Sequence, residues 1–217
     1  GWEKWLLDLA GIGTIADMVP LTGENRLIAS YGLRVLKRTR RPGLINLLRK
    51  ARVNVAEISE EDVGFSIAPR INAASRLGVP MVAFTCISTD KEEEALCAVN
   101  YLESKNNERR RLSEVMSREA IKIAKEKDHL DIVVVGDDEW MPGMVGLIAG
   151  KLADLYSKTF FVWGRGGDGT IKGSSRSCGK VNISELLSAV QKDFDFEFGG
   201  HNLAGGFSVK DGDVSVF

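Results

Sequence analysis

The sequence is poor in cysteine, with three cysteines among 217 residues. They form no Cys-x-x-Cys pair and are too few for a disulfide framework, so we expect free thiols in a reducing, cytoplasmic compartment. The sequence also has no run of the roughly 18 uncharged residues that a membrane helix needs, and no signal-peptide pattern. These absences exclude a disulfide-stabilised secreted scaffold and argue against membrane insertion.

An excess of charge of one sign is absent as well, because the formal net charge is −1. This value excludes a globally basic, histone-like binder but leaves local patches open. The hydrophobic fraction of 44% and the charged fraction of 27% are ordinary for a globular protein. The chain is long enough for one large domain or two small ones. It begins with Gly1 rather than methionine, and we expect it to be a segment of a longer protein.

The first half of the sequence has mainly helical patterns. An apolar segment at 6–19, ending at Pro20, could be helix or strand, and we favour a strand at 15–19. A helix is predicted at 22–38. The segment 40–51 is predicted to contain a turn at Pro42-Gly43 followed by a second helix, and a third helical stretch runs from Ser59 into 68–78. A long charged helix is predicted from about Thr89 to about Lys127, with an apolar stripe of Leu112, Met116, Ala120 and Ile123.

The second half changes to alternating strands and helices. Strands are predicted at 131–136, 159–164 and 170–177 and at the closing GGFSV, with helices at 144–156 and 181–190. This order is typical of an α/β domain.

Asp17 is an anomaly within the first apolar segment. An ionised carboxylate in apolar surroundings is costly unless a cation or hydrogen bonds compensate it. Its position therefore indicates either a functional ligand or a structural ion pair.

Two nucleotide-binding patterns are present only in part. Gly11, Gly13 and Ala16 match the dinucleotide fingerprint, but Pro20 leaves no room for the helix that must follow. Gly173 to Val181 resembles a phosphate loop but has five residues between the glycines and valine in place of the magnesium-binding hydroxyl. We therefore do not expect a dinucleotide or nucleoside-triphosphate site here.

A basic cluster lies between Asn25 and Ala56, a stretch that contains no acid. It could hold a phosphate backbone or form a solvated helix face, and both interpretations stay open. Its cations are Arg26, Arg34, Lys37, Arg38, Arg40, Arg41, Arg49, Lys50 and Arg52.

Three further segments carry anion-binding chemistry. In APRINAASRLG, Arg70 and Arg76 could contact phosphate, or be ordinary arginines of a surface turn. In KGSSRS, hydroxyls and a guanidinium converge at a strand end. In FGGHNLAGG, glycines including Gly199 and Gly200 surround His201 and favour a working role for it over a structural one. The other histidine, His129, is expected to be exposed at a helix end.

The chain resembles the RecJ-type single-strand-specific exonucleases of the DHH/DHHA1 phosphoesterase superfamily. The resemblance is carried by segments in a fixed order: DLAGIGTIADMVPLTGENR, APRINAASRLG, the long charged helix, GMVGLIAGKLADLY, KGSSRS and FGGHNLAGGFSV. The resemblance covers essentially the whole chain. It implies an α/β fold in which the mostly helical C-terminal part of a DHH domain (1–88) is joined by a long helix (89–128) to a DHHA1 domain (129–217). It also implies hydrolysis of single-stranded DNA from 5′ to 3′ with two divalent metals, Mn²⁺ or Mg²⁺.

The resemblance assigns roles to individual residues. Asp17 matches a metal-binding aspartate, and Arg76, with Arg70 nearby, matches the element that faces substrate phosphate. Ser174 and Arg176 match the element that grips the 5′-phosphate, and His201 matches a histidine near the substrate phosphates. Glycine-rich backbone at Gly199 and Gly200 is expected to help position the strand, and a helicase or single-strand-binding protein is a further candidate partner.

The sequence departs from the family in lacking the DxD and DHH motifs, which would precede residue 1. One carboxylate cannot hold two hard cations, so we predict no bound metal pair and no nuclease activity for this chain alone. Smaller departures are Ser75 and Gly205 in place of the family's glycine and alanine, and Cys178-Gly-Lys after KGSSRS. Two alternatives stay open: a nucleic-acid- or phosphate-binding module without hydrolysis, and a DHH phosphoesterase acting on short oligonucleotides or cyclic dinucleotides.

Overall fold

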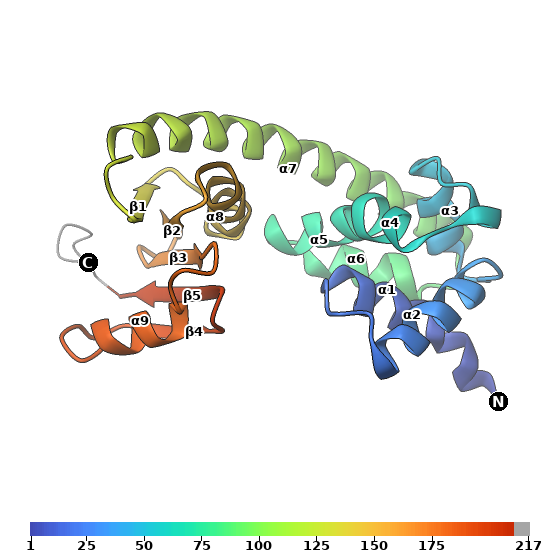
Figure 1. The fold of residues 1–217 in the computed structure, drawn as a ribbon. Helices are drawn as coiled ribbons and strands as arrows, with labels where there is room; N and C mark the ends of the chain where they lie inside the picture. Colours follow the sequence, from blue (N-terminus) through green and yellow to red (C-terminus); the bar gives the residue numbers. More distant parts are fainter. Residues whose placement is uncertain (211–217) are drawn as a thin grey trace. The chain divides into compact units, whose positions relative to one another are not determined.

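The computed structural model describes residues 1–210, which fall into a first compact unit of residues 1–109 and a second that begins at Arg110 (Figure 1). The division falls within helix α7 (Glu92–Glu126), the predicted long helix. The predicted domain boundaries at 88/89 and 128/129 stay a prediction, and residues 211–217 of the expected DHHA1 domain lie outside the described residues. None of the helices within residues 1–210 is long and apolar enough to cross a membrane.

The first unit is helical throughout its described elements. They are η1 (Trp2–Leu6), α1 (Leu7–Ala16), α2 (Gly23–Leu36), α3 (Pro42–Lys50), η2 (Val55–Glu57), α4 (Glu60–Asp62), η3 (Val63–Ile67), α5 (Ala68–Arg76), α6 (Pro80–Ser88) and the first part of α7. The prediction of a strand at 15–19 is wrong, because the apolar run forms α1 and ends at Asp17, its C-cap. Pro42 begins α3 rather than a turn, as suits its fixed φ and missing N–H.

Glycine explains how α1 and α2 pack. A side chain added at Gly11 would come within 2.8 Å of the Gly32 Cα, and one added at Gly32 within 2.6 Å of the Gly11 Cα. The two backbones therefore touch with no side chain between them. The partial dinucleotide fingerprint is thus a helix-packing contact, since Gly11 is buried in the middle of a helix.

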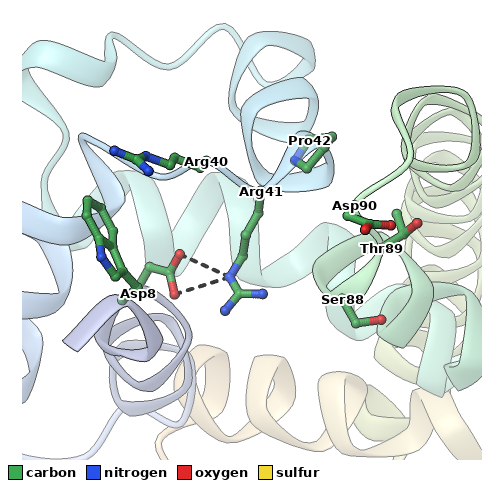
Figure 2. Close-up of a pocket in the computed structure, with 8 residues that line it drawn as sticks. Asp8, Arg40, Arg41, Pro42, Ser88, Thr89 and Asp90 are labelled. Atoms are coloured by element: carbon green, nitrogen blue, oxygen red, sulfur yellow. Dashed lines mark hydrogen bonds and ion pairs between the residues drawn. The ribbon is translucent and has the colours of Figure 1, made fainter. Parts of the chain in front are cut away.

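The anomalous buried carboxylate of the apolar segment is Asp8, not Asp17. Asp8 is 2% exposed, and its oxygens accept hydrogen bonds from the Arg41 Nε at 3.2 Å, the Thr39 hydroxyl at 2.9 Å and the Leu9 amide at 2.7 Å. Arg41 also donates to the carbonyl of Ile87. This ion pair ties α1 to the start of α3 and the end of α6, beside a cavity of about 260 Å³ (Figure 2).

The second unit is built on a five-stranded mixed sheet of order β1-β2-β3-β5-β4. β1 and β2 are parallel and the other pairs antiparallel. The elements are β1 (Ile132–Asp137), α8 (Pro142–Tyr156), β2 (Thr159–Arg165), β3 (Ile171–Arg176), α9 (Ile183–Val190), β4 (Glu197–Gly200) and β5 (Ala204–Val209). The predicted α/β class is confirmed, whereas β4 and, in the first unit, α6 were not predicted.

The two faces of the sheet have separate cores. On one face, α8 and the second part of α7 pack on alternate residues of β1 and β2, including Val135 and Val162. On the other face, α9 contributes Ile183 and Leu187, which pack against Phe161 and Phe207. The predicted stripe of α7 lies in the first of these cores, with Met116 and Ala120 buried. In the first unit, the buried face of α2 consists of Ala29, Gly32 and Leu36, whereas its large side chains Leu27 and Tyr31 are exposed.

Candidate functional site

Strand β3 carries the KGSSRS segment and sorts its side chains between the two faces of the sheet. Ser174 pairs with Val162 of β2 and therefore lies on the α8 face, as do Lys172 and Arg176 two residues to either side. Ser175 points to the opposite face, where it is fully buried and donates to the Gly205 carbonyl. The alternation thus places a hydroxyl and two cations in one row along the strand.

The Arg176 guanidinium is held in place by its own strand. Its Nη1 donates to the Ser174 Oγ at 3.1 Å and to the Ser175 carbonyl at 2.8 Å. Burial lowers the pKa of the Arg176 guanidinium from its ordinary value, and arginine stays charged in proteins. No carboxylate within residues 1–210 forms an ion pair with it. Arg176 is therefore an oriented, half-buried cation without a counter-ion among those residues.

Helix α8 leaves room for this pair at Gly146. A side chain there would lie 3.3 Å from the Ser174 Oγ and 4.0 Å from the Arg176 Nη2. Glycine at this position therefore allows the helix to lie directly beside the hydroxyl and the guanidinium. A larger residue would press against both polar groups.

In the cross-strand row of Ser174, the neighbouring strands β5 and β4 both place a glycine on this face of the sheet. Ser174 pairs with Gly206 of β5, which pairs with Gly199 of β4, and both glycines are exposed. Gly200 is required for a different reason, since a side chain there would meet the backbone of Ala204 and Gly205 at 2.4–2.5 Å. The result is exposed backbone at Gly199 and Gly206 on the same face as an oriented arginine.

His201 lies in the tight turn from β4 to β5. Its amide donates to the Ala204 carbonyl at 2.7 Å, and its side chain is exposed. The turn is fixed from both sides, because Ser177 donates its amide to the Leu203 carbonyl and Ile183 donates to the Asn202 carbonyl, each at 2.9 Å. The pairing of β3, β5 and β4 thus gathers Ser174, Arg176, Gly199, Gly200 and His201 in one unit.

This arrangement can bind an anion. The Nε and Nη2 groups of the fixed guanidinium form no hydrogen bond with residues 1–210. Together with the neighbouring hydroxyl and the exposed glycine backbone, they match the oxygen geometry of a phosphate group. Lys172 on the same face adds a second cation, although Asp168 lies 3.7 Å from its ammonium. Lys172 and Gly146 were missed as site residues, yet strand alternation within KGSSRS could have identified Lys172.

Asp17 lies in the first unit, exposed at the C-cap of α1. Its amide donates to the Gly13 carbonyl at 3.0 Å, and it is followed by Met18 in the left-handed region with φ of 56°. Within residues 1–210, no three His, Cys, Asp or Glu side chains gather where a metal ion could be held. Asp17 alone does not form a metal site.

Arg70 is buried rather than surface-exposed. Its Nε donates to the Glu103 Oε2 of α7 at 2.6 Å, and its Nη1 donates to the Ser66 carbonyl at 2.6 Å in the π-helical turn η3. The side chain is 10% exposed. Arg70 therefore ties α5 and η3 to α7, and Glu103 is the partner that sequence analysis missed.

Arg76 ends α5 six residues after Arg70 and is half-buried. At about 100° per residue, six helical positions separate two side chains by roughly 240°. The two arginines therefore leave α5 on different sides and do not form one paired clamp, and neither belongs to a surface turn.

Comparison with known proteins places the DHHA1 domain family on residues 129–216. The single-stranded-DNA-specific exonuclease RecJ of Bacillus subtilis is 41% identical over 212 residues, covering 96% of this chain and 27% of that protein. RecJ of Escherichia coli is 30% identical and aligns with 98% of this chain and 38% of its own length. The chain thus spans well under half the length of these relatives.

Solved structures agree with the sequence matches. The crystal structure of RecJ in complex with Mg²⁺ from Thermus thermophilus aligns with a TM-score of 0.86 at 33% identity, over 96% of this chain and 32% of that one. A crystal structure of exonuclease RecJ bound to manganese aligns with a TM-score of 0.78 at 32% identity, over 96% of this chain and 51% of that one. Both the helical first unit and the α/β second unit are therefore shared.

Proposed function

Because the chain is a RecJ-type segment with a DHHA1 domain, as its motifs predicted, we propose that it works within a longer exonuclease that hydrolyses single-stranded DNA from the 5′ end. The observation that supports this most is the arginine of β3, oriented by a hydroxyl beside bare glycine backbone. A terminal phosphate carries more charge than an internal phosphodiester, so a fixed guanidinium favours a phosphorylated strand end.

In this proposal the second unit binds the strand end. Ser174 and Arg176 bind the 5′-phosphate, and the exposed glycines Gly199 and Gly206 allow the sugar-phosphate backbone to approach the sheet. His201, exposed on a turn that is fixed at both ends, contacts a phosphate of the same strand. Binding and orientation are therefore supplied by one folded unit.

We further propose that divalent cations, Mn²⁺ or Mg²⁺, serve the hydrolysis, with Asp17 as one ligand. Its exposure at the end of α1 makes its carboxylate available. A cation of this kind takes about six oxygen ligands, and residues 1–210 gather no such set. We propose that the remaining ligands are supplied by the longer protein, so we expect the 217-residue chain alone to be inactive, and we derive no catalytic step from Asp17 by itself.

The two arginines of α5 have different proposed roles. Arg76 is the candidate for direct phosphate contact. Arg70, with its donors already bonded to Glu103 and Ser66, is a positioning residue that fixes α5 against α7. A direct phosphate contact by Arg70 would require breaking a buried ion pair, which is costly.

A longer version of the protein, extended at its N-terminus until it degrades single-stranded DNA with Mn²⁺, tests this function. Asp17→Asn in that protein should abolish cleavage while 5′-phosphorylated strands still bind. Arg176→Gln should instead weaken the preference for a 5′-phosphate over a 5′-hydroxyl. Unchanged cleavage by the Asp17 variant, or robust manganese-dependent degradation by residues 1–217 alone, would contradict the assigned division of roles.

A second candidate is a strand-binding module without hydrolysis of its own. The complete anion-binding arrangement within the second unit favours it, because binding there needs no metal. The same longer protein separates the two candidates: binding without metal-dependent cleavage would support the module.

A further inference from the structure

A second basic site lies in the first unit, around a cavity of about 670 Å³ between α3 and α7. Four cations line it, against a single carboxylate, that of Glu103. The cations are Arg49, Lys50, Arg52 and Arg70. They belong to the basic cluster and the α5 segment noted in the sequence, and the Ser174 site does not use them.

The cavity's single carboxylate is already neutralised. Glu103 accepts hydrogen bonds from Arg70 at 2.6 Å and 3.4 Å, so these two charges compensate each other in the wall. Glu92 accepts a hydrogen bond from the Asn46 amide at 2.8 Å, which orients this carboxylate beside the lining residue Asn46 but leaves its charge in place. The cations Arg49, Lys50 and Arg52 therefore outnumber this one carboxylate, and the balance of charge around the cavity stays positive.

Arg49 and Lys50 both donate to neutral side-chain groups. Arg49 donates to the Asn46 Oδ1 at 3.2 Å, and Lys50 donates to the Asn100 Oδ1 at 3.1 Å. Amide oxygens orient a cation but do not cancel its charge. Both side chains are exposed, so a ligand can reach them.

Arg52 occupies an unusual backbone position. The Val53 amide bonds to the Leu48 carbonyl and the Arg52 amide to the Arg49 carbonyl, which is the Schellman end of α3. Arg52 takes the left-handed conformation there, with φ of 58°, where glycine is the usual residue. The backbone conformation does not explain why this residue is an arginine. A role of the exposed guanidinium in binding a ligand at the cavity would explain it.

We propose that this cavity is a second phosphate-binding surface, which holds the sugar-phosphate backbone of single-stranded DNA through Arg49, Lys50 and Arg52. The choice of single-stranded DNA rests on the proposed function. Three separate cations around an open hollow fit successive phosphates better than one compact anion. The contacts are to phosphate alone, so binding here is independent of base sequence.

Salt-dependent titration of the 217-residue chain with an unphosphorylated single strand tests the proposal. Each phosphate contact adds roughly 0.7 to the slope of log affinity against log salt for single strands. The combined variant Arg49→Gln, Lys50→Gln, Arg52→Gly should therefore lower that slope by about 2 and weaken binding about tenfold or more at roughly 0.1 M salt. The matched control, Lys122→Gln, Lys125→Gln, Lys151→Gln, removes three exposed lysines elsewhere and should leave the slope unchanged.

Arg52→Gly alone separates binding from folding. Glycine relieves the left-handed strain, so the thermal midpoint should rise while the salt slope falls by roughly 0.7. A slope unchanged in the combined variant overturns the proposal. The proposal is also overturned if the combined variant loses binding to a poly-glutamate peptide while its affinity for the single strand stays unchanged. The surface would then bind an acidic protein.

The outcome is independent of the Ser174 site. The ratio of affinities for 5′-phosphorylated and 5′-hydroxyl strands measures that site, and the combined variant should leave the ratio unchanged. A wild-type chain without 5′-phosphate preference, but with a salt slope that depends on these three cations, would refute the proposed function and support this second surface.

Discussion

Arg70 and Glu103 form a nearly buried ion pair, with 2.6 Å between Nε and Oε2, that joins α5 to α7. The same guanidinium donates to the Ser66 carbonyl in the π-helical turn, where the regular hydrogen-bond ladder is interrupted. One side chain therefore contacts both the Glu103 carboxylate of α7 and a backbone carbonyl of the π-helical turn. An arginine that looked like a ligand contact in the sequence is instead part of the framework.

We expect Glu103→Gln to destabilise the first unit by about 2–3 kcal/mol, because it leaves the Arg70 charge buried without its counter-ion. Chemical denaturation followed by circular dichroism measures the change. The control is Glu108→Gln, which breaks the more exposed Lys105–Glu108 pair and should cost less than about 1 kcal/mol. Equal losses in the free energy of unfolding for the two substitutions would show that the buried pair stabilises the unit no more than the exposed one.

Substitution of the two aspartates of the first segment should change stability to very different extents. Asp8→Asn removes the charge that compensates Arg41 in a buried site, and we expect a loss of about 2–3 kcal/mol. Asp17→Asn changes an exposed side chain and should alter stability by less than about 0.5 kcal/mol. Urea denaturation of both variants checks this, and a larger loss at Asp17 would contradict the structural assignment.

Two glycines of α1 offer a matched pair. Gly11→Ala places a methyl group against the Gly32 backbone and should destabilise by about 1–3 kcal/mol. Gly13→Ala meets nothing within 4 Å and should stabilise the helix by up to about 1 kcal/mol, since alanine has the higher helix propensity. Thermal midpoints moving in the same direction for both would rule out close α1–α2 packing.

The three thiols should differ in reactivity. Burial raises the pKa of the Cys86 thiol to about 11, whereas Cys97 and Cys178 are exposed. Because the thiolate is the reactive species, Cys86 in the folded chain has almost none of it at about pH 8. We expect iodoacetamide to modify two cysteines in the native chain and all three in denaturant, as counted by mass spectrometry. Rapid native labelling of Cys86 would contradict its burial.

Much of the second unit could be predicted from the sequence because its strands are β-branched runs separated by strong turn residues. Of the five strands described up to residue 210, four lie close to their predicted positions, as do helices α8 and α9. β4 was missed since four residues with two glycines carry no strand signal. The gathering of Ser174 with Gly199 and Gly206 depends on strand pairing, which local patterns do not reveal.

The first unit shows where local patterns fail. Asp8 is buried because Arg41, 33 residues later, folds back onto it. No periodicity around residue 8 indicates that partner, whereas the run around Asp17 resembles a strand until α2 packs against it. Likewise, the position of Arg70 is set by Glu103 on another helix.

The most direct measurement of the central claim compares the dissociation constants of the 217-residue chain for one single strand with a 5′-phosphate and with a 5′-hydroxyl. A charge-assisted contact contributes about 1.5–3 kcal/mol, so we expect at least about tenfold tighter binding of the phosphorylated strand. Arg176→Gln should remove that preference, and the control Lys122→Gln should keep it. Equal dissociation constants for the two strands in the wild-type chain would contradict a 5′-phosphate site at Ser174 and Arg176.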